Sequence, residues 1–170
     1  IQELSQRART KQIMQNFNPQ EITNSFWALA KLKELHKDFS PSRPFIQELS
    51  KRARAEEIMQ NFNPQDIANS LWALAKLKEF QKDFSPSRPF IQELSQRART
   101  CHIKKYDTAD EITNSFWALA KLKELQKDFS PSRPFIQELS TRARTEQIMQ
   151  NSNPQDIANS LWAFAKFKDI

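Results

Sequence analysis

The chain has 170 residues, a formal net charge of +6 at pH 7, one cysteine and no glycine. A single cysteine excludes an internal disulfide framework, and no run of about 18 apolar residues is present that could span a membrane. The mild excess of basic residues suits polyanionic partners but is far below that of a histone-like tail. Alanine- and leucine-rich segments without alternating β-branched runs predict an all-α fold.

A 45-residue unit recurs along the chain, because Trp27, Trp72, Trp117 and Trp162 lie 45 residues apart. The repeats span 1–45, 46–90, 91–135 and 136–170; the third diverges at 101–109 and the fourth is truncated. Such a period is typical of arrays that bury their core between neighbouring units. Neither end carries a polar capping unit, so we expect a piece of a longer array whose apolar ends can stack end to end.

Each repeat is expected to begin with a helix, called here the first helix. In repeat 2 it follows Ser40-Pro41-Ser42-Arg43-Pro44 and runs from Phe45 to Met59 or Gln60. Phe45, Ile46, Leu49 and Ala53 share one face of this helix. Beyond Ala55 the apolar period slips, so the helix either kinks there or packs its far end against a different neighbour.

A second helix, the Trp helix, follows in each repeat. Asn63 can cap its start in repeat 2, Pro64 suits the first helical position, and Thr108 and Glu111 have the spacing of a capping box in repeat 3. The helix is apolar over most of its circumference, so we expect it to be covered on several sides, with the four tryptophans in the core. The linker 82–89 contains two prolines, and Phe84 is expected to close the joint.

The Trp helix resembles the octotricopeptide repeat family, whose repeats carry a PQ-x-LAN-x-LWALA-x-L core. The residues that match are Pro64, Gln65, Ile67, Ala68, Asn69, Leu71, Trp72, Ala73, Leu74, Ala75 and Leu77. FAST-kinase-like RNA proteins contain a similar segment, and related tandem repeats occur in proteins of intracellular bacteria. The family's repeats are usually about 38 residues long, and Lys78 stands where a glycine often follows. The resemblance implies a right-handed αα-hairpin solenoid that binds RNA.

The exposed face of the first helices gives the candidate RNA-binding residues. Arginines at one position of each repeat would form a basic stripe for phosphates, and nearby Gln and variable positions could contact base edges along a concave face. A solvated helix face with internal ion pairs is the alternative. The candidates are Gln2, Gln6, Arg9, Gln47, Lys51, Arg54, Gln92, Gln96, Arg99, Gln137, Thr141 and Arg144. A second arginine in each repeat, such as Arg52, lies about 200° away and cannot join this stripe.

A protein-binding scaffold is the competing hypothesis. Asn24, Asn69, Asn114 and Asn159 recur on the Trp helices and could hold an extended peptide, although a structural hydrogen bond to a neighbouring turn is the alternative. Lysines such as Lys76 share that polar strip. A scaffold of this kind would bind an extended peptide or a partner helix, as in a bacterial effector array.

Catalytic, cofactor and metal sites are not expected. The chain has two histidines and no glycine for a phosphate-binding loop, and its acidic residues mostly recur as caps and surface pairs. Cys101 and His102 are too few for a structural zinc site. The low cysteine content favours a reducing, intracellular compartment.

Overall fold

The computed structural model describes residues 2–100 and 108–167, and these residues form helices and connecting turns without a strand. The all-α prediction is confirmed for this part of the chain. The helices are α1 (Gln2–Ala8), α2 (Lys11–Met14), α3 (Pro19–Leu35), α4 (Arg43–Ala53), α5 (Glu56–Met59), α6 (Pro64–Phe80), α7 (Arg88–Thr100), α8 (Ala109–Leu125), α9 (Arg133–Ala143), α10 (Glu146–Asn151) and α11 (Pro154–Lys166). None of them is long and apolar enough to cross a membrane.

The Trp helices are α3, α6, α8 and α11, and local capping sets their first residues. The Asn63 side chain accepts a hydrogen bond from the Asp66 N–H at 2.8 Å, and the Asp66 carboxylate accepts one from the Asn63 N–H. The same reciprocal box opens α3 and α11. In repeat 3 the Thr108 hydroxyl accepts from the Glu111 N–H. The predicted caps are therefore confirmed, and each satisfies backbone donors that the first turn leaves unpaired.

The first helices are shorter than expected. Instead of one helix from Phe45 to Met59, α4 ends at Ala53 and a separate short α5 begins at Glu56. Ala55 lies between them with extended backbone angles, φ −61° and ψ 132°. The break falls where the apolar period slips, and it turns Ile58 back into the core.

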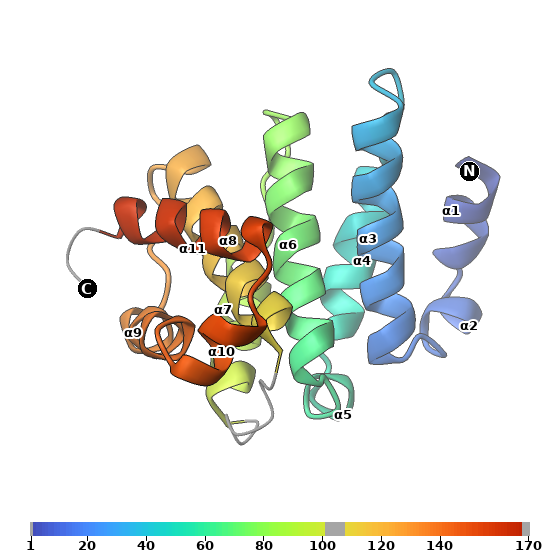
Figure 1. The fold of residues 1–170 in the computed structure, drawn as a ribbon. Helices are drawn as coiled ribbons and strands as arrows, with labels where there is room; N and C mark the ends of the chain where they lie inside the picture. The colour runs from blue at the N-terminus through green and yellow to red at the C-terminus, as the bar shows by residue number, and fades with distance from the viewer. Residues whose placement is uncertain (1, 101–107, 168–170) are drawn as a thin grey trace.

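Equivalent helices lie side by side in two layers (Figure 1). The Trp helices pack directly on one another, α3 on α6, α6 on α8 and α8 on α11. The first helices α4, α7 and α9 contact each other less closely, and each packs against the preceding Trp helix, α4 on α3, α7 on α6 and α9 on α8. The first helix of one repeat thus forms a hairpin with the Trp helix before it.

Phenylalanines fill the space between the two layers. Phe26 stacks on Phe90 with ring centroids 5.7 Å apart, and Phe62 meets the same ring edge-on at 6.4 Å. The linker residues Phe84 and Phe129 are buried, as predicted for residues that close the joints. One continuous apolar core therefore runs through the described repeats.

The tryptophans do not lie in this core, so that expectation was wrong. Trp72, Trp117 and Trp162 are half-buried at its edge, and 46% of the Trp27 side chain is exposed. A lysine of the preceding Trp helix lies over the ring of Trp72, Trp117 and Trp162, and Lys31 lies over that of Trp27. The core positions of the Trp helix are taken by the residues next to the tryptophans, among them Phe26, Leu71 and Phe116.

Candidate nucleic-acid interface

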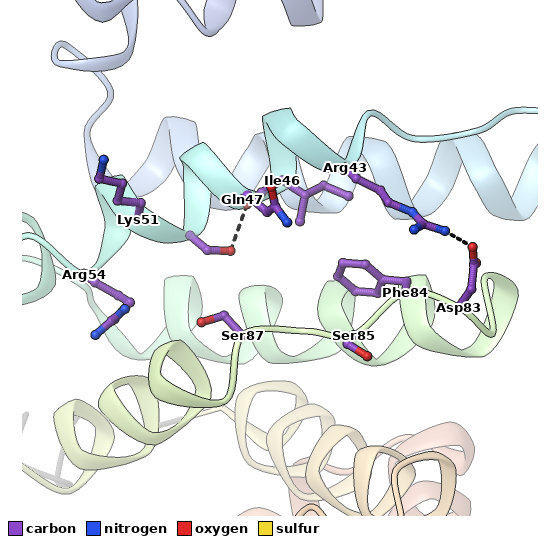
Figure 2. A pocket seen from close by; sticks show the side chains of 10 residues that line it. Arg43, Ile46, Gln47, Lys51, Arg54, Asp83, Phe84, Ser85 and Ser87 are labelled. Atoms are coloured by element: carbon purple, nitrogen blue, oxygen red, sulfur yellow. Dashed lines mark hydrogen bonds and ion pairs between the residues drawn. The ribbon is translucent and has the colours of Figure 1, made fainter.

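A cavity of about 390 Å³ lies between α4 and the linker that leads into α7 (Figure 2). Three of the predicted RNA-binding residues, Gln47, Lys51 and Arg54, line its α4 side. Ser85 and Ser87 belong to its linker side. The remaining lining residues are Arg43, Ile46, Ser50, Asp83 and Phe84. The cavity lining therefore combines basic and polar groups with an apolar part of at least equal extent.

The α4 side of this cavity follows from the division of α4 into a buried face and an exposed face. Ile46, Leu49 and Ala53 are buried, which fixes the rotation of the helix and leaves Gln47 and Arg54 on the outer face. Opposite them, burial of Phe84 anchors the linker. The Ser87 hydroxyl accepts a hydrogen bond from the Phe90 N–H at 3.4 Å and so holds the start of α7.

An equivalent cavity of about 440 Å³ occurs one repeat later. Its α7 side carries the predicted residues Gln92, Gln96 and Arg99, and Ser130 and Ser132 face them from the next linker. These five residues stand at the positions of Gln47, Lys51, Arg54, Ser85 and Ser87. The structure therefore brings the predicted Gln, variable and Arg positions together in successive repeats.

A third cavity, of about 480 Å³, joins repeats 1 and 2. Arg9 and Lys11 line one side of it, and Glu48, Lys51 and Arg52 line the other. Lys51 borders both this cavity and the one beside Arg54. A path of basic side chains thus leads from Arg9 through Lys51 to Arg54.

The predicted residues at the two ends of the chain do not join these cavities. Gln2 and Gln6 are exposed on α1, and Gln137 and Thr141 are exposed on α9. The Thr141 hydroxyl donates to the Gln137 carbonyl within α9. Arg144 folds back on its own helix, where it donates to the Ser140 carbonyl and hydroxyl and lies 5.5 Å from the Phe164 ring centroid.

Two of the basic side chains that line the cavity in repeat 2 already form ion pairs with acidic side chains. Arg54 Nε donates to Glu93 Oε1, on α7 of the next repeat, at 2.9 Å. Arg43 forms an ion pair with Asp83 across the cavity entrance. An incoming anion must therefore compete with carboxylates that are already in place.

In repeats 2 and 3 the second arginine has a structural role. Arg52 Nε donates to the Phe17 carbonyl and Arg97 Nε donates to the Phe62 carbonyl, each at 3.2 Å. Both carbonyls belong to the turn just before a Trp helix. This recurring bond ties a first helix to the preceding repeat. Arg52 also lines the cavity that joins repeats 1 and 2, although it is absent from the one beside Arg54, so the expectation that it cannot serve the same surface as Arg9 is only partly met.

The side of the Trp helices that faces away from the first helices forms a second repeating surface. Lys31 Nζ lies 5.0 Å from the Trp72 ring centroid, and Lys76 Nζ lies 5.0 Å from that of Trp117. Lys121 Nζ continues the series over Trp162 at 5.4 Å. The sequence places Trp and Lys four apart on each helix, but the contact from one repeat to the next could be found only from the packing of the layer.

Ion pairs neutralise the lysines of this second surface. Lys121 Nζ contacts Glu79 at 3.0 Å and Glu124 at 3.3 Å. Burial by itself would raise the pKa of Glu79, but hydrogen bonds from Lys121 and Lys76 outweigh it and hold the pKa below its ordinary value. Burial would likewise lower the pKa of Lys121, and its bonds to Glu79 and Glu124 raise it instead. These groups are therefore charged and paired at neutral pH.

The predicted asparagine series lies along the same surface. Asn24 is exposed, and Asn69, Asn114 and Asn159 are half-buried. The Asn159 amide oxygen accepts a hydrogen bond from the Gln155 side chain at 2.9 Å. The side chains of Asn24, Asn69 and Asn114 have no hydrogen-bond partner among the described residues, so the expected structural bond to a neighbouring turn is not formed there.

Metal ligands do not gather in the part of the chain that the structure describes, where no group of three or more His, Cys, Asp or Glu side chains lies together. Cys101 and His102, together with the rest of 101–107, lie outside the described residues. Comparison with known proteins gives no match, either to a family model, to a curated protein or to a solved structure.

Proposed function

We propose that this chain is a right-handed αα-solenoid of 45-residue repeats that binds single-stranded RNA in the cavities between its first helices and the linkers that follow. One observation carries the proposal. The same set of side chains, Gln, a variable polar residue and Arg, lines a cavity with two linker serines in successive repeats. The resemblance of the Trp helices to the octotricopeptide repeats supports the same assignment.

Each residue type of this set suits one part of a nucleotide. An arginine fork binds a phosphate through charge-assisted hydrogen bonds. Glutamine amides and serine hydroxyls can both donate and accept, as base edges and the 2′-hydroxyl require. Such contacts need unstacked bases, because the major groove of a duplex RNA is too deep and narrow for side chains. One nucleotide per repeat follows from one set per repeat.

The packing indicates where the RNA would lie. The Trp helices contact each other closely, whereas the first helices contact each other less closely, and cavities lie between them and the following linkers. In a bent array the more closely packed layer lies on the inner side, which favours placing the first helices on the outer side. The proposed RNA path therefore follows the cavities past Arg9, Lys51, Arg54 and Arg99, and a concave face is not required.

Binding of labelled single-stranded homopolymer RNAs across a salt series tests the proposal. With three phosphate contacts, log K should fall with log salt concentration with a slope of about −2. Changing Arg9, Arg54 and Arg99 to alanine should abolish most of this binding. Changing the exposed linker lysines Lys37, Lys82 and Lys127 to alanine removes the same charge and should leave most of it.

Two outcomes would contradict the proposal. One is the absence of binding to any homopolymer at about 50 mM salt by a folded chain. The other is an equal loss of binding in the arginine and lysine variants, because that would show attraction to net charge without a defined site.

A protein-binding scaffold remains the second candidate, favoured by the unpartnered amides of Asn24, Asn69 and Asn114. An amide side chain can donate to and accept from a peptide group at once. The lysines beside them are already paired with glutamates, so this surface suits a neutral backbone better than a phosphate. Selection of displayed random peptides, with Asn69 and Asn114 changed to alanine as control, would recover binders that need both amides if this candidate holds.

A further inference from the structure

The cavity that joins repeats 1 and 2 contains positive charge that is not paired within the chain. Its volume of about 480 Å³ is typical of sites for small molecules. Arg9 and Lys11 line one side of it, and Lys51 lines the other. The side chains of these three residues form no ion pair or hydrogen bond within the part of the chain that the structure describes. Arg9, Lys11 and Lys51 are called here the cation cluster.

The other charged residues of the lining do not neutralise this cluster. Arg52 is already engaged, because it donates to a carbonyl of the preceding turn and pairs with Glu57 at 2.8 Å. Glu48 is the acidic side chain of the lining and is half-buried. In the next repeat Arg54 pairs with the glutamate equivalent to Glu48, whereas Arg9 forms no such pair. Three unpaired cations thus outnumber one carboxylate, which favours a multiply charged anion as the ligand.

Two departures from the repeat pattern create the excess of positive charge. Lys11 stands where repeats 2 and 4 have a glutamate, and Lys51 stands where repeats 1 and 3 have a glutamine. The two lysines belong to different repeats, yet they line the same cavity. The equivalent positions between repeats 2 and 3 are Glu56 and Gln96, so the excess is not repeated there. The cation cluster is therefore a single site on the array, unlike the set of residues that recurs in each repeat.

We propose that the cation cluster binds a small ligand that carries two adjacent phosphate groups. Cations on both sides of the cavity favour a ligand with anionic oxygens at both ends, as a diphosphate has. The Arg9 guanidinium suits one phosphate through paired hydrogen bonds, and the ammonium groups of Lys11 and Lys51 act as point charges. The proposal does not rest on RNA binding, although Arg9 and Lys51 also belong to the proposed RNA path.

Isothermal titration calorimetry with inorganic pyrophosphate in metal-free buffer tests this site. The probe carries two phosphate groups without a sugar or a base, so the result is independent of RNA binding. At about 50 mM salt, where charge interactions are only partly screened, the wild type should bind pyrophosphate at one site. Inorganic phosphate should bind at least about tenfold more weakly, because it cannot contact both sides of the cavity at once.

Two variants that restore the residues of other repeats identify the site. Lys51→Gln should weaken pyrophosphate binding about tenfold, as the loss of one charge-assisted hydrogen bond predicts. Lys11→Glu should weaken it further, because an anion replaces a cation. Lys82→Gln and Lys37→Glu are the matched controls, since they make the same charge changes on exposed linkers. Each control should weaken binding less than about twofold, because salt screens distant charges.

The unfolding temperature of each variant, followed by circular dichroism, separates a loss of the site from a loss of the fold. A folded wild type that does not bind pyrophosphate would overturn the proposal, and so would equal affinities for phosphate and pyrophosphate. Full affinity in folded Lys51→Gln would also overturn it. An equal loss in Lys11→Glu and Lys37→Glu would do the same, because binding would then follow net charge without a defined site.

Discussion

The ammonium group of Lys76 on α6 lies 5.0 Å from the ring centroid of Trp117 on α8, and it also pairs with Glu79 at 3.0 Å. One lysine therefore links its own helix to the next repeat. Its alkyl chain covers part of an indole that would otherwise face water. This arrangement stabilises the contact between neighbouring Trp helices on their outer side, where the apolar core no longer reaches.

Lys76→Met should lower the free energy of unfolding by about 1 kcal/mol, because the variant loses both the contact to Trp117 and the pair with Glu79. Urea denaturation followed by circular dichroism gives this value. Lys82→Met, on the exposed linker after α6, is the control and should change the stability by less than about 0.5 kcal/mol. An equal effect in both variants would show that Lys76 has no special role.

Truncating Phe116 to alanine should destabilise the protein more than truncating its larger neighbour Trp117. Phe116 is fully buried and packs on Phe164 and Phe167, so Phe116→Ala should cost about 3–5 kcal/mol. Trp117 is half-buried, so Trp117→Ala should cost about 2 kcal/mol. Equilibrium unfolding of the two variants checks this, and a larger loss for Trp117 would contradict the placement of the indoles at the edge.

Substituting Arg97 should lower the stability, whereas substituting Arg99 should weaken RNA binding. Arg97→Ala removes the bond to the Phe62 carbonyl and should cost about 1–2 kcal/mol of stability. Arg99→Ala should change stability by less than about 0.5 kcal/mol and should weaken RNA binding. Unfolding and RNA-binding measurements on both variants make the comparison. The assignment fails if Arg99→Ala leaves the RNA affinity unchanged at low salt.

Glu93→Gln should strengthen RNA binding, because it releases Arg54 from its pair with Glu93. An exposed pair of this kind is worth up to ~1 kcal/mol, so the affinity should rise about two- to fivefold. Glu138→Gln changes the same position of the next repeat, where the carboxylate contacts Arg142 at 3.6 Å. It adds the same net charge and should have a smaller effect in the same titration.

Acid should weaken the contact between α6 and α8. The folded-state pKa of Glu79 lies below its ordinary value of 4.5, so its ionised form contributes stability above that pH. This contribution is lost as the pH falls through the lower, folded-state pKa. The difference in unfolding free energy between the wild type and Glu79→Gln should therefore be constant near neutral pH and shrink below about 4.5. A difference that does not change with pH would show that the carboxylate charge is not involved.

The caps and the linker joints could be predicted from the sequence because they depend on residues close together in the chain. Asn63 and Asp66 are three residues apart and meet in any helix that begins there. The apolar period slips near the break at Ala55. From the sequence, this slip fitted both a kinked helix and a helix whose far end packs against a different neighbour. The location of the tryptophans could not be predicted, because the exposed side of a nearly apolar helix depends on which neighbours cover the rest.

The candidate site was only partly predictable for the same reason. The spacing of Gln47, Lys51 and Arg54 placed them on one face of a helix, and the structure keeps them together. Their partners Ser85 and Ser87 come from a linker more than 30 residues later and became visible only in the folded chain. Arg144 has the same place in its repeat as Arg54 but turns onto Ser140, beside the partly buried Phe164 of the last helix.

No described residue adopts a positive φ, and every described Trp helix begins with a cap from within its own repeat. The unit therefore contains no position that only glycine could occupy and no helix start that depends on a distant residue. Inserting or removing one whole unit would therefore create no residue that needs a positive φ and no Trp helix without a cap.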